Sequence, residues 1–211
     1  MFQWLFQFKI HRKIEENLKE MSAIANRFLK TLYEEFETMI TPIREQEWEQ
    51  EIDNCRKEII TNLNKSRINT SLKVEKYKLF LRLNLLLERI ETFHHNLVVD
   101  KEKLSDKELE KLREALEEAI KSTSILENSV RFLYSDFRAA ENELQKLDNS
   151  CQNSLEKIKE FKYPSASKGL KWDPKKATEI IGNSLRKIIQ GIIFVKEKMI
   201  EITEEFRQDK N

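Results

Sequence analysis

The amino-acid sequence predicts an all-α fold: an elongated antiparallel four-helix bundle from which a long, coiled-coil-like helical hairpin projects. Gly and Pro together number only six in 211 residues, too few for the turns that a sheet requires. Charged residues make up 36% of the chain while apolar residues still make up 39%, which is typical of helices with large solvated faces. Apolar residues also recur at steps of three and four, the period of an α-helix. We therefore predict one all-helical domain, residues 1–211.

The first predicted helix covers about residues 10–40. Thr41 and Pro42 end it and open the next helix, because Thr is a good N-cap and Pro suits the first helical position. The apolar stripe of the first helix consists of Ile14, Leu18, Met21, Ala25, Phe28, Leu32, Phe36 and Met39.

The second predicted helix covers about residues 42–99. A polar stretch from Asn62 to Ser71 interrupts its apolar stripe, and Leu63 and Ile68 on that stripe are five residues apart. Asn, Ser and Thr side chains compete with the backbone for hydrogen bonds, so a kink or a frayed turn is expected there. The sequence leaves open whether the helix continues through this stretch.

The third predicted helix covers about residues 105–161 and has the most regular stripe in the chain. It begins at Ser105 and Glu108, which are spaced as a capping box. From Leu109 to Ile158 its apolar positions alternate in steps of three and four without a break, which predicts a long seam packed against other helices.

The last predicted helix covers residues 174–208 and follows a loop from Lys162 to Asp173. Its apolar face is the widest of the four, so we expect it to be the most buried helix. Gly182 and Gly191 each lower helix stability by about 1 kcal/mol relative to Ala. We expect both glycines to allow close approach of a neighbouring helix.

Only Asp100 to Leu104 separate the second and third predicted helices, and so short a link predicts an antiparallel hairpin with its tip at about residues 85–120. If the turn is centred near residue 103, Cys55 and Cys151 lie level across the seam and could form a thiol pair. Residues 100–118 carry five basic and eight acidic side chains, whereas residues 162–176 carry five Lys and one Asp. The same topology therefore predicts an acidic tip and a basic opposite end.

The sequence contains no motif that predicts catalysis or a cofactor. Glu91 and His94 resemble half of a di-iron carboxylate site, but such sites need a second Glu-x-x-His motif, and the only other histidines are His11 and His95. Glycine-rich phosphate-binding loops and nucleophile elbows are also missing from the sequence. We therefore expect a protein that is not an enzyme and uses neither a metal nor a cofactor.

The net charge and the number of cysteines indicate which partners and which cellular compartment to expect. The net charge of +1 gives no global basic footprint for nucleic acid. No apolar run approaches the roughly 20 residues that span a bilayer. Two cysteines are too few for a disulfide framework. We predict a cytoplasmic protein, or one that is peripheral to a membrane.

The N-terminal segment is the most unusual part of the sequence, because aromatic residues precede a cluster of cations. This pattern fits a shallow anchor at a membrane interface, but it fits equally a set of core residues or a contact with a partner or a second copy. The candidate contact residues are Phe2, Trp4, Leu5, Phe6, Phe8, Lys9, Arg12 and Lys13.

The lysine-rich loop is a second candidate surface. Aromatic side chains between cations can bind single-stranded nucleic acid by stacking and phosphate contacts, although a solvated loop with two anchoring aromatics has the same composition. The candidate contacts are Lys162, Lys168, Lys171, Trp172, Lys175 and Lys176.

These observations together predict a non-catalytic interaction or scaffold protein that acts through its helix faces, as part of a larger assembly or as a homodimer. The first alternative is a peripheral membrane protein anchored by its aromatic N-terminus. The second alternative is a helical subunit of a nucleoprotein complex that uses the loop at 162–176.

Overall fold

The computed structural model describes residues 2–34, 36, 42–66, 70–163 and 174–208. These residues form helices and no strand, which confirms the predicted all-α class. In place of the four predicted helices there are six α-helices and one 3-10 turn within the described residues. Their bounds are α1 Phe2–Glu34, α2 Pro42–Lys65, α3 Thr70–Asp100, η1 Lys101–Lys103, α4 Asp106–Phe132, α5 Phe137–Lys162 and α6 Pro174–Gln208.

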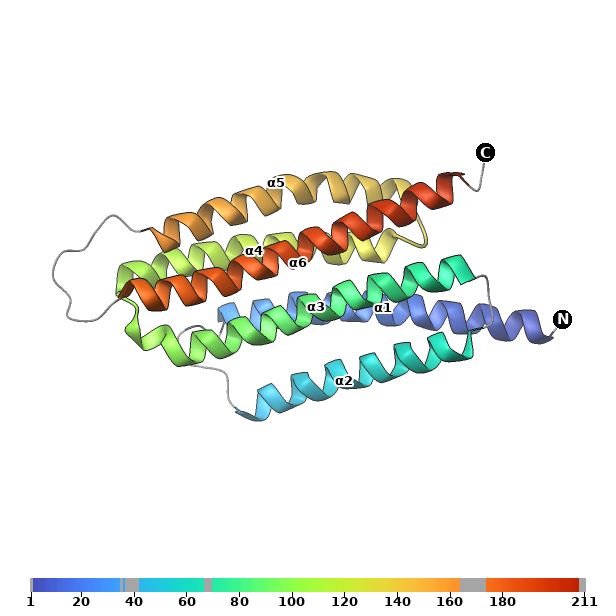
Figure 1. Cartoon of the computed structure of the whole chain (residues 1–211), viewed down its shortest axis with the longest axis horizontal. Coiled ribbons are helices and arrows are strands. Elements are labelled where there is room, and N and C mark those ends of the chain that lie inside the picture. The colour runs from blue at the N-terminus through green and yellow to red at the C-terminus, as the bar shows by residue number, and fades with distance from the viewer. Residues whose placement is uncertain (1, 35, 37–41, 67–69, 164–173, 209–211) are drawn as a thin grey trace.

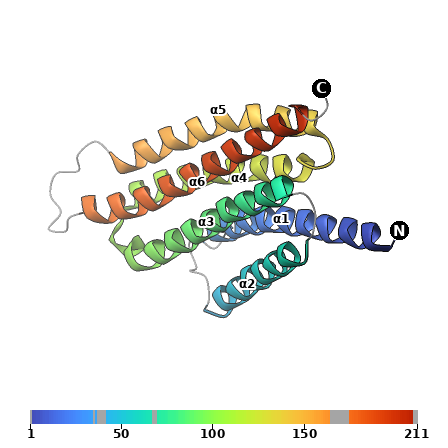
Figure 2. The same cartoon turned by 45° about the vertical axis from the view of Figure 1, so that its right-hand side comes forward.

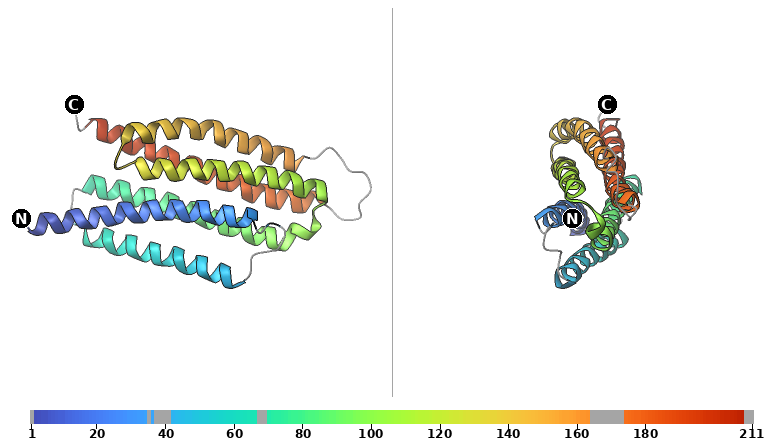
Figure 3. Two further views of the ribbon diagram at one scale, coloured as in Figure 1. Left: turned by 180° about the vertical axis from the view of Figure 1, so that it is seen from behind. Right: turned by 90° about the vertical axis from the view of Figure 1, so that its left-hand side faces the viewer.

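The helices lie side by side along the long axis of an elongated bundle (Figure 1). α6 packs against α3, α4 and α5, and α1 packs against α2, α3 and α4. α2 lies on one side of the bundle, against α1, while α5 lies on the opposite side (Figure 3). The two chain ends and the turn between α4 and α5 are at the same end of the bundle, and the first turns of α1 extend beyond the neighbouring helices there (Figures 1 and 3).

The predicted continuous helix 105–161 is wrong, because the chain reverses between α4 and α5. Ser135 N and Asp136 N both donate to Phe132 O, at 2.9 and 2.8 Å, and so end α4 in a tight turn. The Asp136 side chain then accepts from Ala139 N at 3.1 Å and caps α5. α4 and α5 therefore pack against each other as an antiparallel pair.

The contact between α4 and α5 includes a small polar cluster inside an otherwise apolar seam. Ser122 Oγ lies 2.8 Å from Ser150 Oγ and 3.1 Å from Ser154 Oγ, and all three side chains are buried. Ser154 Oγ also donates to the backbone carbonyl oxygen of Ser150 at 3.0 Å, so each of the three hydroxyls has a hydrogen-bond partner. Small side chains with satisfied hydroxyl groups let the two helices approach closely without leaving a buried polar group unpaired.

The predicted projecting tip at 85–120 is also wrong, because α6 packs along α3 in that region. Arg89 Nη1 donates to Lys187 O at 2.8 Å. A Cβ atom added at Gly191 would lie 3.1 Å from Leu86 Cδ1, so this glycine does permit the close approach that we expected. Because α4 and α5 reverse, the start of α4 and the end of α5 lie at the same end of the bundle, and Lys157 on α5 pairs with Glu114 on α4 at 3.0 Å. The predicted separation of acidic and basic ends therefore does not hold.

The predicted helix 42–99 is divided in two at the polar stretch. Ser66 N donates to Asn62 O at 3.0 Å and to Leu63 O at 3.3 Å, which closes the last turn of α2. α3 then starts at Thr70. α1 begins at Phe2, earlier than predicted, and ends at Glu34, while residues 37–40 of the predicted first helix lie outside the described residues.

The last helix and the capping box agree with the sequence. α6 has the predicted bounds, and its inner face is buried at Ile181, Leu185, Ile188, Ile189, Ile192, Val195 and Met199. At the start of α4, the Glu108 carboxylate accepts from Ser105 N at 2.9 Å and from Ser105 Oγ at 2.7 Å.

The reversal between α4 and α5 can be tested at its cap. Asp136→Ala removes the acceptor for Ala139 N and should lower the free energy of unfolding by about 1 kcal/mol, as measured by urea unfolding. Asp136→Asn retains a capping oxygen and should lose much less. Equal losses in the two variants would contradict a capping role for Asp136.

Candidate interaction surface

A line of large apolar side chains is exposed on the first half of α3. Val74, Tyr77 and Leu81 are 45%, 46% and 45% exposed. Their spacing of three and four residues puts them on one face of the helix. On the buried side of the same segment, Leu79, Phe80 and Leu83 belong to the core, so α3 is apolar on two faces here.

The apolar line on α3 continues onto α2 at Ile60, which is 46% exposed. Arg56 Nε on α2 donates to Asn84 Oδ1 on α3 at 2.5 Å, and this bond sets the register of the two helices. α2 and α3 run antiparallel (Figure 2), so Ile60, one turn beyond Arg56, and Leu81, three residues before Asn84, lie at about the same level. We refer to Ile60, Val74, Tyr77 and Leu81 as the α2–α3 strip.

The strip is exposed because α2 is held mainly by α1. The apolar face of α2, Ile52, Cys55, Ile59 and Leu63, is buried in the core that it shares with α1. α2 and α3 make far fewer contacts with each other than either makes with α1. α3 therefore keeps an apolar face that α2 does not cover.

Basic side chains surround the strip. Residues 72–82 contain four basic residues and a single acidic one, Glu75. Glu75 is buried and pairs with Lys198 on α6, and its other oxygen accepts from Lys78 at 2.8 Å. Lys57 and Arg82 are exposed on α2 and α3. Lys57, Lys78 and Arg82 are therefore the solvated cations at the rim of the strip, while Lys76 is buried. The exposed Glu201 on α6 lies near Lys78 and Arg82, whose charges, after the hydrogen bond from Lys198, contribute to lowering its pKa.

A buried ionic cluster lies behind the strip and joins three helices. Lys76 on α3 is 1% exposed, and its ammonium donates to Glu15 Oε1 at 2.6 Å and contacts His11 Nδ1 at 3.1 Å, both on α1. His11 Nε2 lies 3.1 Å from Ser66 Oγ at the end of α2. An ammonium group cannot accept a hydrogen bond, so Nδ1 accepts from Lys76 and the neutral ring carries its proton on Nε2.

Burial governs the titration of this cluster. Desolvation, and then the charge of Lys76, lower the pKa of His11 to about 4. Desolvation also lowers the pKa of Lys76, an effect that Glu15 opposes. The Lys76 ammonium lies 4.9 Å from the centre of the Tyr134 ring. Burial raises the pKa of the Tyr134 hydroxyl, which has no hydrogen-bond partner among the residues that the structure describes. His11 and Lys76 are buried and Glu15 is only partly exposed, so the main effect of the cluster is to fix α1, α2 and α3 in register.

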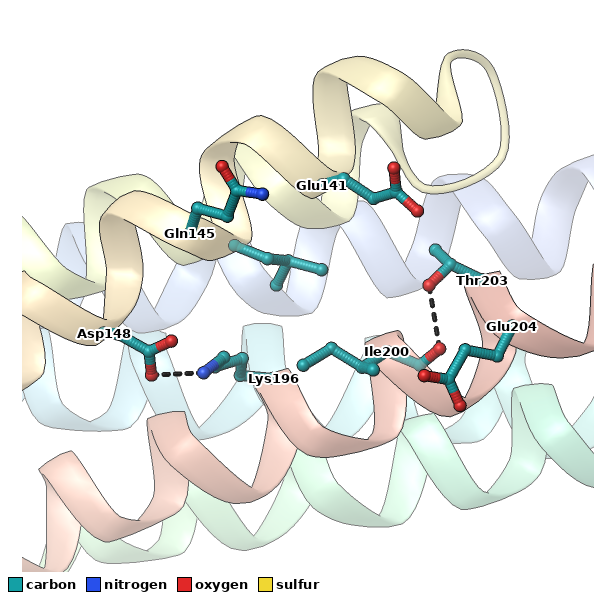
Figure 4. Close-up of a pocket in the computed structure, with 8 residues that line it drawn as sticks. Glu141, Gln145, Asp148, Lys196, Ile200, Thr203 and Glu204 are labelled. Atoms are coloured by element: carbon teal, nitrogen blue, oxygen red, sulfur yellow. Dashed lines mark hydrogen bonds and ion pairs between the residues drawn. The ribbon is translucent and has the colours of Figure 1, made fainter. Parts of the chain in front are cut away.

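A hollow of about 280 Å³ lies between α5 and α6 (Figure 4). Lys196 and Asp148 form an ion pair across it, and Thr203 Oγ1 donates to Ile200 O at 2.8 Å. Its other lining residues are Glu141, Leu144, Gln145 and Glu204. This hollow is acidic and open, and its polar groups are those of two neighbouring helix surfaces.

The predicted N-terminal contact residues are only partly described. Phe2 to Phe6 are helical, but their side chains lie outside the described residues. Phe8 is 57% exposed, and Lys9 and Lys13 are exposed. Arg12, also exposed, pairs with Glu16 at 3.0 Å.

Most of the predicted lysine-rich loop lies outside the described residues. These include Lys168, Lys171 and Trp172, together with the side chain of Lys175. Lys162 donates to Asn183 Oδ1 at 2.7 Å and lies over the Tyr163 ring, while Lys176 is exposed. The Lys162 side chain also packs against Gly182 on α6, because a Cβ atom added to that glycine would lie only 2.5 Å from Lys162 Cγ.

The structure does not bring the two cysteines together. Cys55 Sγ on α2 donates to Asn17 O at 3.4 Å, whereas Cys151 is on α5, on the opposite side of the bundle (Figure 1). The predicted level pairing assumed an unbroken hairpin, which the turn at residues 133–136 rules out. Burial raises the pKa of Cys55 to about 12 and that of Cys151 to about 11, so both are unreactive packing thiols.

The half di-iron pattern does not form a metal site in the described part of the chain, where no group of three or more His, Cys, Asp or Glu side chains is placed to hold a metal ion. His94 is buried beside two aromatic rings, with ring centres 6.1 Å from Phe28 and 6.3 Å from Trp48. It lines a small hollow of about 70 Å³ with these residues and Glu91.

Comparison of the chain with protein-family models, with curated proteins and with solved structures gave no match. Within the described residues, no helix combines the length and the apolar character that crossing a membrane requires.

Our reading of the sequence missed the α2–α3 strip. The signal was present: Val74, Tyr77 and Leu81 have helical spacing and lie off the main apolar stripe, which passes through Leu79 and Leu83. A second apolar face on one helix indicates either a second buried contact or an exposed surface. The sequence does not distinguish these cases, because that depends on how closely α2 approaches.

The buried histidine predicts a pH dependence of stability. Because the pKa of His11 falls from 6.5 to about 4 on folding, the unfolded chain takes up a proton on His11 at a higher pH than the folded chain does. The free energy of unfolding should therefore fall as the pH drops from about 6.5 towards 4. Lys76 from α3 and the Ser66 hydroxyl contact this ring, and Glu15 from α1 and the ring of Tyr134 lie next to Lys76.

His11→Gln cannot take up this proton, so its free energy of unfolding should change less than that of the wild type between about pH 7 and pH 5. Urea unfolding of both proteins at both pH values measures this difference. The contributions of titratable groups that the two proteins share cancel in the comparison. A wild type and variant that lose equal stability would show that another group is responsible.

Proposed function

We propose that this chain is a non-catalytic interaction protein that binds a partner through the α2–α3 strip. The observation that carries the proposal is the strip itself: four large apolar side chains, each close to half exposed, lie together on two adjacent helices. Contiguous exposed apolar patches with a polar rim are typical of protein interaction sites. Isolated exposed apolar residues are common, so it is the grouping of these four that supports the proposal.

The burial and the pKa values of the potential nucleophiles support a non-catalytic role. Cys55 and Cys151 are buried and have raised pKa values, whereas a reactive cysteine needs a lowered one. Lys76 has a lowered pKa but is 1% exposed and is hydrogen-bonded to Glu15. These groups are placed to pack the bundle.

Capture experiments with the tagged full chain test this proposal. Tyr77→Ser with Leu81→Ser should remove the bound proteins that the wild type retains, because these two side chains form the centre of the strip. The matched control is Val98→Ser with Val99→Ser, which changes two exposed apolar residues on the same helix, 41% and 54% exposed, away from the strip. Retention of the same proteins by the strip variant would refute the proposal, provided that its circular dichroism shows a folded bundle.

Association with a membrane surface is a second candidate function, and the start of α1 favours it. The first turns of α1 extend beyond the ends of the other helices (Figure 1), and Phe8 is 57% exposed there beside exposed Lys9 and Lys13. Aromatic side chains next to cations are suited to the interfacial region of an anionic bilayer.

Vesicle flotation distinguishes this second function. The full chain should float with anionic vesicles, whereas a chain that begins at Lys9 should not, because it lacks the aromatic residues of the first turns. Neutral vesicles serve as the control for charge. If neither chain floats, the aromatic residues do not act as an anchor.

A further inference from the structure

We propose that the partner bound by the α2–α3 strip is an acidic amphipathic helix, an inference that rests on the proposed function. Val74, Tyr77 and Leu81 follow one another at steps of three and four residues along α3, so they form a line roughly 10 Å long. Ile60 on the antiparallel α2 borders this line. A helix that lays its apolar face on such a line contacts it with residues at i, i+3, i+4 and i+7.

The charge around the strip selects the sign of the partner. Lys57, Lys78 and Arg82 are exposed on the two helices, and Lys78 and Arg82 follow the strip residues Tyr77 and Leu81 directly. Of the acidic groups nearby, Glu75 is buried in its ion pair with Lys198, Glu58 accepts from Asn17 on the α1 side of α2, and the exposed Glu201 pairs with Lys198 on α6 at 2.7 Å. A partner helix with carboxylates beside its apolar face would meet this rim with complementary charge.

The same rim disfavours a second copy of this chain as the partner. In a symmetric dimer the strip would face the strip of the other copy, which would bring the cations beside one strip towards the cations beside the other. Like charges placed opposite each other across an interface are unfavourable. A membrane surface is a less suitable partner, because the strip side chains are only about half exposed and have charged neighbours, so they cannot insert far into a bilayer.

A pair of designed peptides tests the inference. Each is about 14 residues long, so that a helix covers the strip, and has Leu at i, i+3, i+4 and i+7. One carries Glu at the flanking positions, and its twin carries Lys at the same positions. Fluorescence anisotropy with the full chain should show the Glu peptide binding about tenfold more tightly than the Lys peptide at low salt, with a smaller difference at high salt.

Two sets of variants assign the effect to the strip. Tyr77→Ser with Leu81→Ser should weaken binding of both peptides at least about tenfold. Lys57→Gln with Lys78→Gln should remove the preference for the Glu peptide and leave the apolar contact in place. Lys30→Gln with Lys107→Gln, which removes two exposed cations on α1 and α4, is the matched control and should change neither affinity.

The outcomes separate this inference from the proposed function. Equal binding of the two peptides at the strip would overturn the acidic partner but leave the strip as a binding surface. If neither peptide binds, the inference fails, and the proposed function then depends on the capture experiment alone. Strip-dependent binding to vesicles of phosphatidylcholine and phosphatidylserine, or a strip-dependent dimer in light scattering, would also overturn it in favour of a membrane or a second copy.

Discussion

The close contact between α3 and α6 is the constraint on which the rest of the bundle depends. Gly191 lets the two backbones approach until Leu86 and Arg89 lie against α6, and Arg89 donates to the carbonyl oxygen of Lys187. α6 buries its other apolar positions against α4 and α5 and so joins the α4–α5 pair to α3, a connection that α1 also makes through its contacts with α3 and α4. Without the α3–α6 contact, the contact of α1 with α4 would be left to hold the α4–α5 pair to the rest of the bundle, and α6 and α3 would each have an unburied apolar face. A larger side chain at Gly191 would therefore act on the whole fold and not only on one helix.

In the first half of α3, buried ion pairs determine the positions of α1 and α6 relative to this helix. Lys76 pairs with Glu15 on α1, and Glu75 pairs with Lys198 on α6, so two adjacent residues bind two different helices. Ion pairs with so little exposure add little net stability, because removing the charges from water opposes their attraction. If α1 or α6 shifted along α3, one of these pairs would break and leave a buried charge without its partner, which is unfavourable. The pairs therefore exclude alternative registers of α1 and α6 along α3. Near this end, Ser66 at the end of α2 contacts His11 on α1 and accepts from Lys73 on α3.

Local signals in the sequence predicted the elements better than their arrangement. The bounds of α6 and the capping box at Ser105 and Glu108 follow from side chains that act within a few residues, and both are confirmed. The reversal at 133–136 was missed because the apolar stripes of α4 and α5 stay in phase across the turn, at Val130, Leu133, Phe137 and Ala140. A periodic stripe has the same appearance in one long helix and in two antiparallel helices. The Asp136 cap was the available signal, and once it was missed the position of Cys151, the projecting tip and the separation of charges were predicted wrongly as well.

The candidate surface was harder to predict than the fold, because its two properties depend on long-range contacts. Exposure of Tyr77 and Leu81 depends on the distance between α2 and α3, which depends largely on how α2 packs on α1. The charge of the rim depends on Glu75, which in the sequence alternates with lysines as if it balanced them on the surface. In the structure Lys198 draws this carboxylate into the bundle from a position 123 residues further along the chain. The ion pair that orders α6 on α3 is therefore also the interaction that leaves the strip with a basic rim, so fold and surface charge have a common origin.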